Sequence, residues 1–235
     1  MTSSIRLYVD APLHDRAEPD ATPAQAHYLA SVMRRGVGDE LRLFNGMDGE
    51  FLARIHSLRR DRARFAVQRR LRVQTVGPDL WLLFAPLKRD ATDLVVQKAT
   101  ELGVAAILPV FTERTNAARL NETRLAAIAT EAAEQCERLT VPRIDAPRRL
   151  ADRLAEWPAG RRLVVAMERI NAGPIRAEPG PTALLIGPEG GFTPVELDAL
   201  RRRPFVLPAT LGSLILRAET AAIAGLALLQ APAGG

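Results

Sequence analysis

The stretch TALLIGPEGGFTPVEL, residues 182–197, joins an apolar run, a glycine-rich turn and the start of a helix. Thr193 and Glu196 have the spacing of a capping box with Pro194 at the first helical position, so free N–H groups point back toward the turn. Such a loop often holds a nucleotide phosphate. Glu189 and the lack of a following lysine disfavour phosphate here. The residues therefore favour a nucleoside-type ligand with positive charge and no phosphate, the alternative being a simple strand-to-helix turn.

The stretch LGSLILRAETAAIAG, residues 211–225, places Arg217 between an apolar run and an alanine-rich helix. Glu219 and Thr220 fall in the first turn of that helix, where capping and compensation of the helix dipole explain an acid and a threonine. A cation is unfavourable at the same place, because the helix N-terminus carries partial positive charge. Arg217 therefore indicates an anionic partner.

Two further stretches gather polar side chains at the ends of elements. APLKRDATDLVVQKATELGV, residues 85–104, places Lys88 and Arg89 where a strand meets a helix, beside the predicted cleft. EAAEQCERLTVP, residues 131–142, presents one polar face that includes Arg138. A capped helix with exposed charges and an ordinary amphipathic helix are the alternatives for these two stretches.

From residue 79 onward, apolar runs typical of buried strands alternate with helical patterns. Strands are predicted at 80–86, 105–110, 162–167, 182–187 and 205–208. Helices are predicted at 91–103, 121–139, 193–203 and 217–230. This alternation indicates a mainly parallel sheet with helices on both faces, whose ligands bind beyond the carboxyl ends of the strands. The glycine-rich turn lies at such an end.

The residues before this region predict a small β-rich unit with one helix. The helix is expected over 22–36, with Thr22 and Gln25 as a capping box and Gly36 at its end. The strand pattern covers 6–9 and a hairpin that turns at an Asn-Gly pair, followed by ARFAVQRRLR. Residues 73–78 read as a linker.

Arginines are concentrated in this first part of the chain. Residues 54–72 contain eight arginines and one acid, although the chain's formal net charge is only +5. An alternating stretch of this kind provides a cationic face for a phosphate backbone, and a solvated edge hairpin is the alternative.

The overall composition excludes several classes of protein. Hydrophobic residues make up 47% and charged residues 25% of the chain, which is ordinary for a globular protein. No run approaches the ~18 apolar residues of a membrane helix and the start lacks an apolar signal region, so a cytoplasmic location without a membrane partner is expected. Cys136 is the single cysteine, and the three histidines lack metal-ligand spacing, so no metal is expected.

Six blocks occur in order over nearly the whole length: HYLASVMR with VGDELRLFNG, KxxxxDxxxxKATELGV, ERT, EAAEQC-R-TVP, IGPEGGF and LG-ILRAETA. Together they resemble the bacterial ribosomal RNA small-subunit uridine N-3 methyltransferase family, a branch of the knotted SPOUT methyltransferases. The resemblance implies an α/β protein with a PUA-like RNA-binding β-barrel over 1–74 and a SPOUT domain with a trefoil knot over 79–235. It also implies a homodimer that uses S-adenosylmethionine to methylate N-3 of a specific uridine in 16S ribosomal RNA of the small subunit.

The resemblance also assigns roles to residues. Those expected to hold S-adenosylmethionine are Ile186, Gly187, Pro188, Glu189, Gly190 and Gly191, and those expected to wall its adenine are Leu207, Leu211, Leu214 and Leu216. Arg217 is expected to stabilise the uridine anion, and Glu219 or Glu189 to accept the N-3 proton. Those expected to contact RNA are Arg34, Arg59, Arg60, Arg62, Arg64, Lys88, Arg89 and Arg138.

At Gly190 a β-branched side chain is not expected to fit, because it would block close backbone approach to the ligand and forbid a positive φ.

Three positions depart from the family pattern: Ala91 and Leu214 replace arginines, and Glu137 replaces a glycine. Two other functions therefore stay open, a related knotted methyltransferase acting on another RNA and an RNA-binding assembly factor that has lost catalysis.

Overall fold

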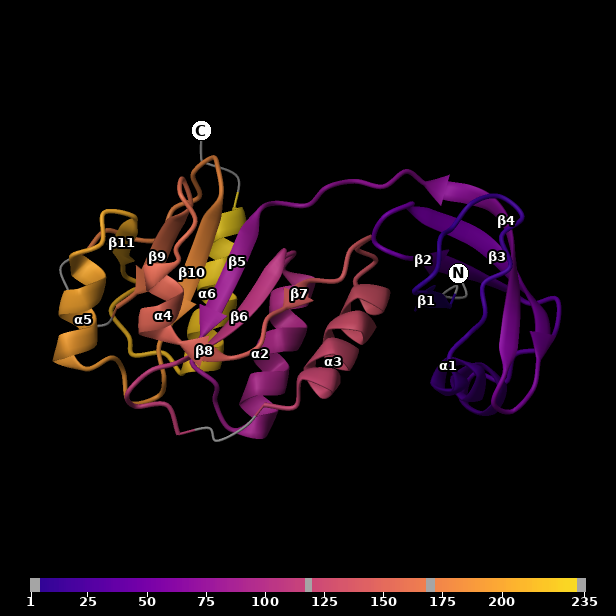
Figure 1. Ribbon diagram of the computed structural model, residues 1–235, viewed down its shortest axis with the longest axis horizontal. Helices are drawn as coiled ribbons and strands as arrows, with labels where there is room; N and C mark the ends of the chain where they lie inside the picture. The colour runs from indigo at the N-terminus through magenta and orange to yellow at the C-terminus, as the bar shows by residue number, and fades with distance from the viewer. Residues whose placement is uncertain (1–4, 117–119, 168–171, 232–235) are drawn as a thin grey trace. The chain divides into compact units, whose positions relative to one another are not determined.

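The computed structural model describes residues 5–116, 120–167 and 172–231, and the chain divides into two compact units. The N-terminal unit contains the residues up to Val76 together with 133–141. The C-terminal unit contains 77–132 and the residues from Pro142 onward. Figure 1 labels the elements of both units.

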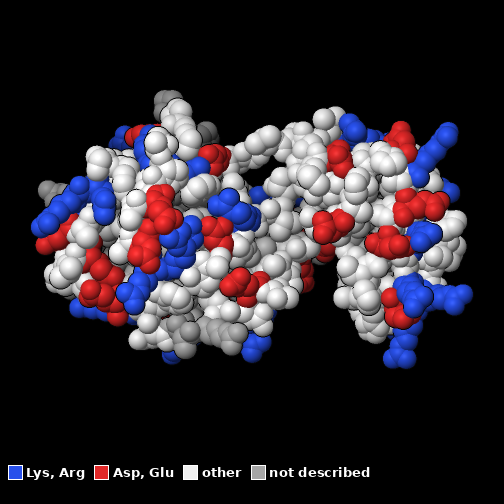
Figure 2. All heavy atoms as spheres, in the orientation of Figure 1, with Lys and Arg blue, Asp and Glu red and all other residues white. Residues whose placement is uncertain are grey.

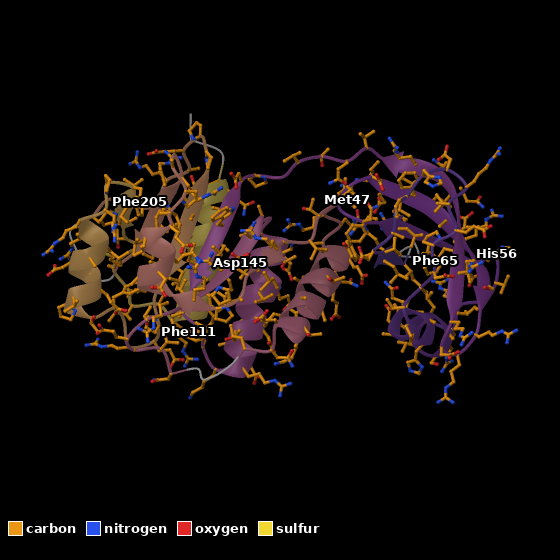
Figure 3. All side chains as sticks on the ribbon, viewed as in Figure 1. Met47, His56, Phe65, Phe111, Asp145 and Phe205 are labelled. Carbon is orange, nitrogen blue, oxygen red and sulfur yellow. The ribbon has the colours of Figure 1, made fainter. Side chains whose placement is uncertain are left out.

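The N-terminal unit is built on a four-stranded sheet with the order β1-β2-β3-β4. Its strands are β1 (Arg6–Tyr8), β2 (Glu40–Phe44), β3 (Glu50–Leu58) and β4 (Ala63–Arg72). β1 pairs with β2 in parallel, and the other two pairs are antiparallel. Side chains alternate between the two faces, so Phe65 is fully buried while His56 is exposed on the outside (Figure 3).

The predicted Asn-Gly hairpin is confirmed between β2 and β3. The side-chain oxygen of Asn45 accepts hydrogen bonds from the N–H groups of Met47 and Asp48, at 3.0 and 2.8 Å. Gly49 has a φ of +99°, and a Cβ there would lie 2.2 Å from the carbonyl oxygen of Arg72. The turn therefore requires glycine at this position.

The helix of the N-terminal unit is shorter than predicted. Thr22 and Gln25 form the expected capping box at the start of α1 (Pro23–His27), which continues into a π-helical turn, η1 (Tyr28–Val32). The chain then leaves the helical conformation, and Arg34 adopts a φ of +51°. Gly36 therefore does not end the helix, because Arg34 already takes the left-handed conformation at the helix end.

A buried arginine attaches segment 133–141 to the N-terminal sheet. The Arg6 side chain donates hydrogen bonds to the carbonyl oxygens of Ala133 and Arg138, at 2.6 and 2.5 Å, and to the Glu50 carboxylate at 2.5 Å. Its guanidinium lies 3.7 Å from the centre of the Phe44 ring. Burial lowers the pKa of Arg6, and the hydrogen bond that Arg6 donates to the Glu50 carboxylate partly opposes that shift.

The C-terminal unit contains a parallel sheet with the order β11-β9-β10-β5-β6-β7, and β8 also pairs with β6. The strands are β5 (Leu80–Phe84), β6 (Ala106–Phe111), β7 (Arg143–Ile144), β8 (Arg148–Arg149), β9 (Arg162–Ala166), β10 (Thr182–Ile186) and β11 (Val206–Ala209). All of these pairs are parallel. The predicted strands and their parallel arrangement are confirmed, and the two-residue strands β7 and β8 were not predicted.

Helices cover both faces of this sheet, as predicted. They are α2 (Arg89–Glu101), α3 (Glu122–Gln135), α4 (Leu150–Ala155), α5 (Pro194–Arg201) and α6 (Ala218–Gln230), and of these α4 was not predicted. Leu154 of α4 and Leu200 of α5 share one core with Leu185 of β10. On the other face α6 packs on α2 and β10, where a Cβ on Gly225 would lie 2.7 Å from Leu184. Figure 1 shows α4 in front of the sheet and α6 behind it.

The predicted helix over 121–139 ends early, at Gln135. Its start is confirmed, because the Asn121 side chain accepts a hydrogen bond from the Arg124 N–H group at 3.0 Å. Its end is set by Glu137, which has a φ of +59°. Glycine adopts this conformation most easily, and Glu137 instead forms a 2.7 Å ion pair with Arg42.

The strand order changes direction between β5 and β10. β5 leads through α2 to β6 on one side, whereas β10 leads through α5 to β11 on the other. Ligands of open parallel sheets bind at such a switch point, beyond the carboxyl ends of the strands. Within the described ranges, no helix is long and apolar enough to cross a membrane, and no cluster of three metal-binding side chains is found.

Candidate functional site

A cavity of about 1340 Å³ lies at the carboxyl ends of β5, β9, β10 and β11. Four segments at the ends of these strands form most of its lining, 88–91, 166–167, 186–192 and 210–219, and Leu197 and Ala221 complete it. Of the predicted site residues, the cavity brings together Lys88, Arg89, Ile186, Gly187, Pro188, Glu189, Gly190, Gly191, Leu211, Leu214, Leu216, Arg217 and Glu219. Stretches that are up to about 130 residues apart in sequence therefore meet at the predicted end of the sheet.

The glycine-rich loop forms a closed turn. The Gly191 N–H group donates a hydrogen bond to the carbonyl oxygen of Pro188 at 2.8 Å, and Gly191 has a φ of +67°. The Phe192 ring folds back on Gly187, so a Cβ at Gly187 would lie 2.9 Å from the ring. The loop is thus ordered by its own contacts.

The expectation that Gly190 has no room for a side chain and takes a positive φ is wrong. A Cβ at Gly190 would meet only the Arg114 side chain, at 3.5 Å, and the backbone there does not have a positive φ. Gly191 carries the left-handed conformation instead. Loop length and composition do not reveal which of two adjacent glycines takes that conformation.

The helix after the loop begins as the sequence predicts. The Thr193 hydroxyl accepts a hydrogen bond from the Glu196 N–H group at 3.3 Å, and the Glu196 carboxylate accepts one from the Thr193 N–H group at 2.9 Å. Pro194 occupies the first helical position of α5. This reciprocal cap fixes the direction in which the chain leaves the loop.

Two cations stand at helix starts in this cavity. Arg217 is the N-cap of α6 and Lys88 is the N-cap of α2, and neither side chain makes a capping hydrogen bond. Arg217 is exposed, and Glu219 lies in the first turn of α6 as predicted. A cation beside a helix N-terminus is unfavourable in isolation, so both positions fit a cavity that receives an anionic group.

The cavity as a whole is balanced in charge. Its basic side chains are Lys88, Arg89 and Arg217, and its acidic side chains are Asp90, Glu189 and Glu219. A cationic ligand and an anionic ligand can therefore each find a partner in the same space. Ala91, where the family pattern has arginine, also lines the cavity beside Arg89.

An apolar wall is formed by the segment before α6. Leu211, Leu214 and Leu216 line the cavity, and Leu214 is 78% exposed. Leu207 lies in β11, is 41% exposed and is not among the described side chains that line the cavity. The assignment of Leu207 to the adenine wall therefore lacks the geometric support that the other three leucines have.

Sequence reasoning missed several lining residues. Met167 follows β9, Phe192 ends the glycine loop, and Ser213 and Ile215 lie between the predicted leucines. The signal for Met167 was present, because residues 162–167 were predicted as a strand whose carboxyl end lies at the same edge of the sheet. Phe192 belongs to the quoted block but reads as a core residue.

Four of the predicted RNA-contacting arginines of the N-terminal unit lie on one hairpin. Arg59, Arg60 and Arg62 are exposed in the turn between β3 and β4, which is closed by a 2.7 Å hydrogen bond from the Arg59 N–H group to the Arg62 carbonyl oxygen. Arg64 forms a 2.8 Å ion pair with Asp20. Figure 2 shows basic and acidic side chains interspersed on the viewed face.

The two other predicted RNA contacts in this unit differ in exposure. Arg34 is exposed just after η1. Arg138 is partly buried, and its guanidinium donates a 2.9 Å hydrogen bond to the Thr140 hydroxyl. Burial lowers the pKa of Arg138. Arg138 therefore has a structural role in its own loop, and its contact with RNA stays a prediction.

The sequence matches two models of known protein domains. Residues 75–230 match the sequence model of an RNA methyltransferase domain, and residues 21–68 match that of an RNA methyltransferase PUA domain. The N-terminal unit is therefore PUA-like, and the parallel sheet belongs to the methyltransferase domain. The architecture is mixed α/β, as predicted.

Individual relatives agree with these matches over nearly the full length. The chain is 34% identical to ribosomal RNA small subunit methyltransferase E of Rickettsia conorii, covering 96% of this chain and 94% of the relative. A protein of Legionella pneumophila solved with bound cofactor SAM is 31% identical, with a TM-score of 0.88 and 98% of both chains covered. The Neisseria gonorrhoeae ribosomal RNA small subunit methyltransferase E bound to S-adenosyl methionine is 29% identical, with a TM-score of 0.87 and 97% of both chains covered. With this agreement in sequence and fold, the chain belongs to the ribosomal RNA small subunit methyltransferase E family.

Proposed function

We propose that this protein transfers a methyl group from S-adenosylmethionine to N-3 of a specific uridine in 16S ribosomal RNA of the small subunit. The observation that carries the proposal is the cavity at the switch point, which both the glycine-rich loop and Arg217 line. Its residues fit the donor: apolar Leu211 and Leu216 suit an adenine, and three carboxylates in the same cavity suit a positively charged sulfonium. Family membership supports the same reaction.

When bound, S-adenosylmethionine supplies an electrophilic methyl group. The N-3 proton of uridine must leave before or during attack, so the ring develops negative charge. Arg217, Glu219 and Glu189 all line the cavity. In the proposed reaction Arg217 stabilises that charge by charge-assisted hydrogen bonds, and Glu219 or Glu189 accepts the proton. Holding both reactants in one cavity contributes by proximity.

The finer features of the fold are part of the proposal. We assign a PUA-like barrel to 1–74 and a knotted SPOUT domain to 79–235. Barrel closure is supported by backbone hydrogen bonds from Phe65 to Pro19 and from Val67 to Ala17, at 3.0 and 2.9 Å, which pair a further segment with β4. A knot is supported by α6, which follows the edge strand β11 yet packs on the central strands β5 and β10.

A homodimer is also part of the proposal. Leu94 of α2 and Leu228 of α6 are 36% and 42% exposed, on two helices that pack together. Apolar side chains exposed on neighbouring helices suit contact with a second copy of the chain. Sedimentation equilibrium should give twice the mass of 25.6 kDa, and a monomer at working concentration would contradict this assignment.

Small-subunit ribosomal RNA is the proposed partner, and the hairpin arginines are expected to contact its phosphates. Replacing Arg59, Arg60 and Arg62 together with alanine should weaken RNA binding and flatten its salt dependence by about 0.7 to 0.9 per lost contact. The matched control replaces the exposed arginines Arg201, Arg202 and Arg203 of the C-terminal unit. If both triple variants bind RNA with the same affinity and the same salt slope, the hairpin is a solvated edge without phosphate contacts.

Binding of S-adenosylmethionine is expected to depend on Gly191. The change Gly191→Val places a β-branched residue at a φ of +67°, which costs on the order of 1–3 kcal/mol and distorts the turn that holds the ligand. Calorimetry should show a loss of affinity of about tenfold or more in a protein that still melts cooperatively. Gly190→Ala is the control, and it should bind nearly normally because its Cβ meets no contact shorter than 3.5 Å. Normal binding by Gly191→Val would remove this turn from the site.

Methyl transfer itself tests the function. The protein is incubated with S-adenosylmethionine labelled in its methyl group and with small-subunit ribosomal RNA from cells that lack the protein. Label is expected in that RNA and not in other RNAs. Label in another RNA would favour a related enzyme of different specificity. Failure to bind S-adenosylmethionine in calorimetry would favour the non-catalytic assembly factor.

A further inference from the structure

A second loop holds the glycine-rich turn from outside the cavity. It follows β6 and comprises residues 112–115, which include the ERT block. The Arg114 guanidinium donates a 2.8 Å hydrogen bond through Nη1 to the carbonyl oxygen of Gly190. Its Cδ and Cβ atoms lie 3.5 and 3.7 Å from the place of a Cβ on Gly190. Arg114 therefore contacts the turn through both its charge and its aliphatic stem.

The peptide unit between Gly190 and Gly191 is held at both ends. Its carbonyl oxygen accepts from Arg114 at 2.8 Å, and its N–H group donates to Pro188 at 2.8 Å. A peptide between two glycines rotates easily, because neither residue has a Cβ to oppose it. Rotation of this unit would carry Gly191 from its φ of +67° to a negative φ. Arg114 opposes that rotation.

The loop that carries Arg114 is itself tied to the start of α5. The Glu113 N–H group donates to the Glu196 carboxylate at 2.9 Å, and the other oxygen of that carboxylate accepts from Thr193 at 2.9 Å. Within the loop, the Thr112 N–H group donates to the Thr115 hydroxyl at 2.9 Å. The backbone of Arg114 is thus fixed relative to the turn that its side chain holds.

We propose that Arg114 is a positioning residue for the donor site, because it keeps the Gly190–Gly191 peptide in the one orientation that binds S-adenosylmethionine. The inference rests on the proposed function for the identity of the ligand. Arg114 acts through the turn and is not among the described residues that line the cavity. A direct phosphate contact is the competing role, since Arg114 is exposed.

The experiment compares Arg114→Ala, Arg114→Lys and the exposed control Arg201→Ala in the full chain. Arg114→Ala is expected to raise the Kd and KM for S-adenosylmethionine by about tenfold, the effect of one charge-assisted hydrogen bond near the surface. Its kcat at saturating S-adenosylmethionine should stay within about twofold, because bound ligand restores the turn. Arg114→Lys, which keeps one donor, should recover part of the affinity. Unchanged Kd and KM in Arg114→Ala would overturn the proposal.

A double-mutant cycle with Gly191→Ala tests the peptide rotation directly. Alanine at position 191 favours a negative φ, so it releases the same peptide unit that Arg114 holds. The two changes together should cost at least the sum of the two single losses, because both favour the same rotated peptide and binding must reverse that rotation. A double variant that loses clearly less affinity than this sum would overturn the rotation mechanism.

RNA-binding measurements distinguish the positioning role of Arg114 from the competing phosphate contact. A phosphate contact predicts weaker RNA binding and a salt slope lower by about 0.7 to 0.9 in Arg114→Ala, with S-adenosylmethionine affinity unchanged, and would contradict the proposal. Failure of the unmodified protein to bind S-adenosylmethionine would overturn the proposed function together with this inference. Loss of affinity confined to the variants would leave the function standing and support the positioning role.

Discussion

Replacing Arg217 with alanine is expected to slow methyl transfer by on the order of 100- to 1000-fold, because the change removes one preorganised donor at a developing negative charge. Binding of S-adenosylmethionine and of RNA should be retained. Stability should not fall, since Arg217 makes no capping hydrogen bond and a cation at the start of α6 is unfavourable. Single-turnover methylation measured beside a melting curve checks both statements.

Arg201→Ala is the matched control, because Arg201 is exposed on α5 and does not line the cavity. It should react at the normal rate. If Arg217 only shapes the last helix, Arg217→Ala will melt earlier and the folded fraction will turn over normally. A folded Arg217→Ala protein with the unmodified rate would therefore exclude the assigned role in the reaction.

The largest expected loss of stability follows from Arg6→Ala. Glu50 is 1% exposed, and its ion pair with Arg6 is the shortest of its contacts, since Arg42 and Arg72 lie 3.7 Å away. Removing one partner of a buried ion pair typically costs about 3–5 kcal/mol, and the two remaining arginines favour the lower end. Denaturant unfolding, followed through the transition of the N-terminal unit, measures this loss in the free energy of unfolding.

Two further variants identify the cause. Arg64→Ala removes an exposed ion pair with Asp20 and should change stability by less than about 1 kcal/mol. The double change of Arg6 to Met and Glu50 to Gln should cost less than Arg6→Ala alone, because no buried charge is left without its partner. A double variant that is as unstable as Arg6→Ala would show that the aliphatic packing of Arg6, and not its charge, holds segment 133–141.

The sequence predicted those elements whose signals lie close together along the chain. The capping boxes at Thr22 and Thr193 form as expected, since the residues that make each one lie three apart in sequence. Alternation of strands and helices also predicted a parallel sheet and the edge at which the cavity lies. The prediction of Arg217 at that edge followed from the same reasoning, because a cation at a helix start has no local explanation.

Features that depend on distant contacts could not be predicted in this way. Arg6 reads as an ordinary surface arginine, and its burial depends on carbonyl groups more than 120 residues away. The early end of α3 depends on Glu137, whose left-handed φ is unexpected for that residue type. Gly190 and Gly191 are chemically identical, and only the turn hydrogen bond to Pro188 distinguishes them.

Mapping the modified nucleoside tests the central claim most directly. Small-subunit ribosomal RNA from cells that lack the protein is treated with the purified protein and S-adenosylmethionine, then digested and mapped by mass spectrometry. The proposed reaction predicts one new methyl group on the base of a single uridine, at N-3, with the Arg217→Ala protein giving far less in the same time. A new methyl group on a ribose or on another base, or no new methyl group in that RNA, would contradict the account.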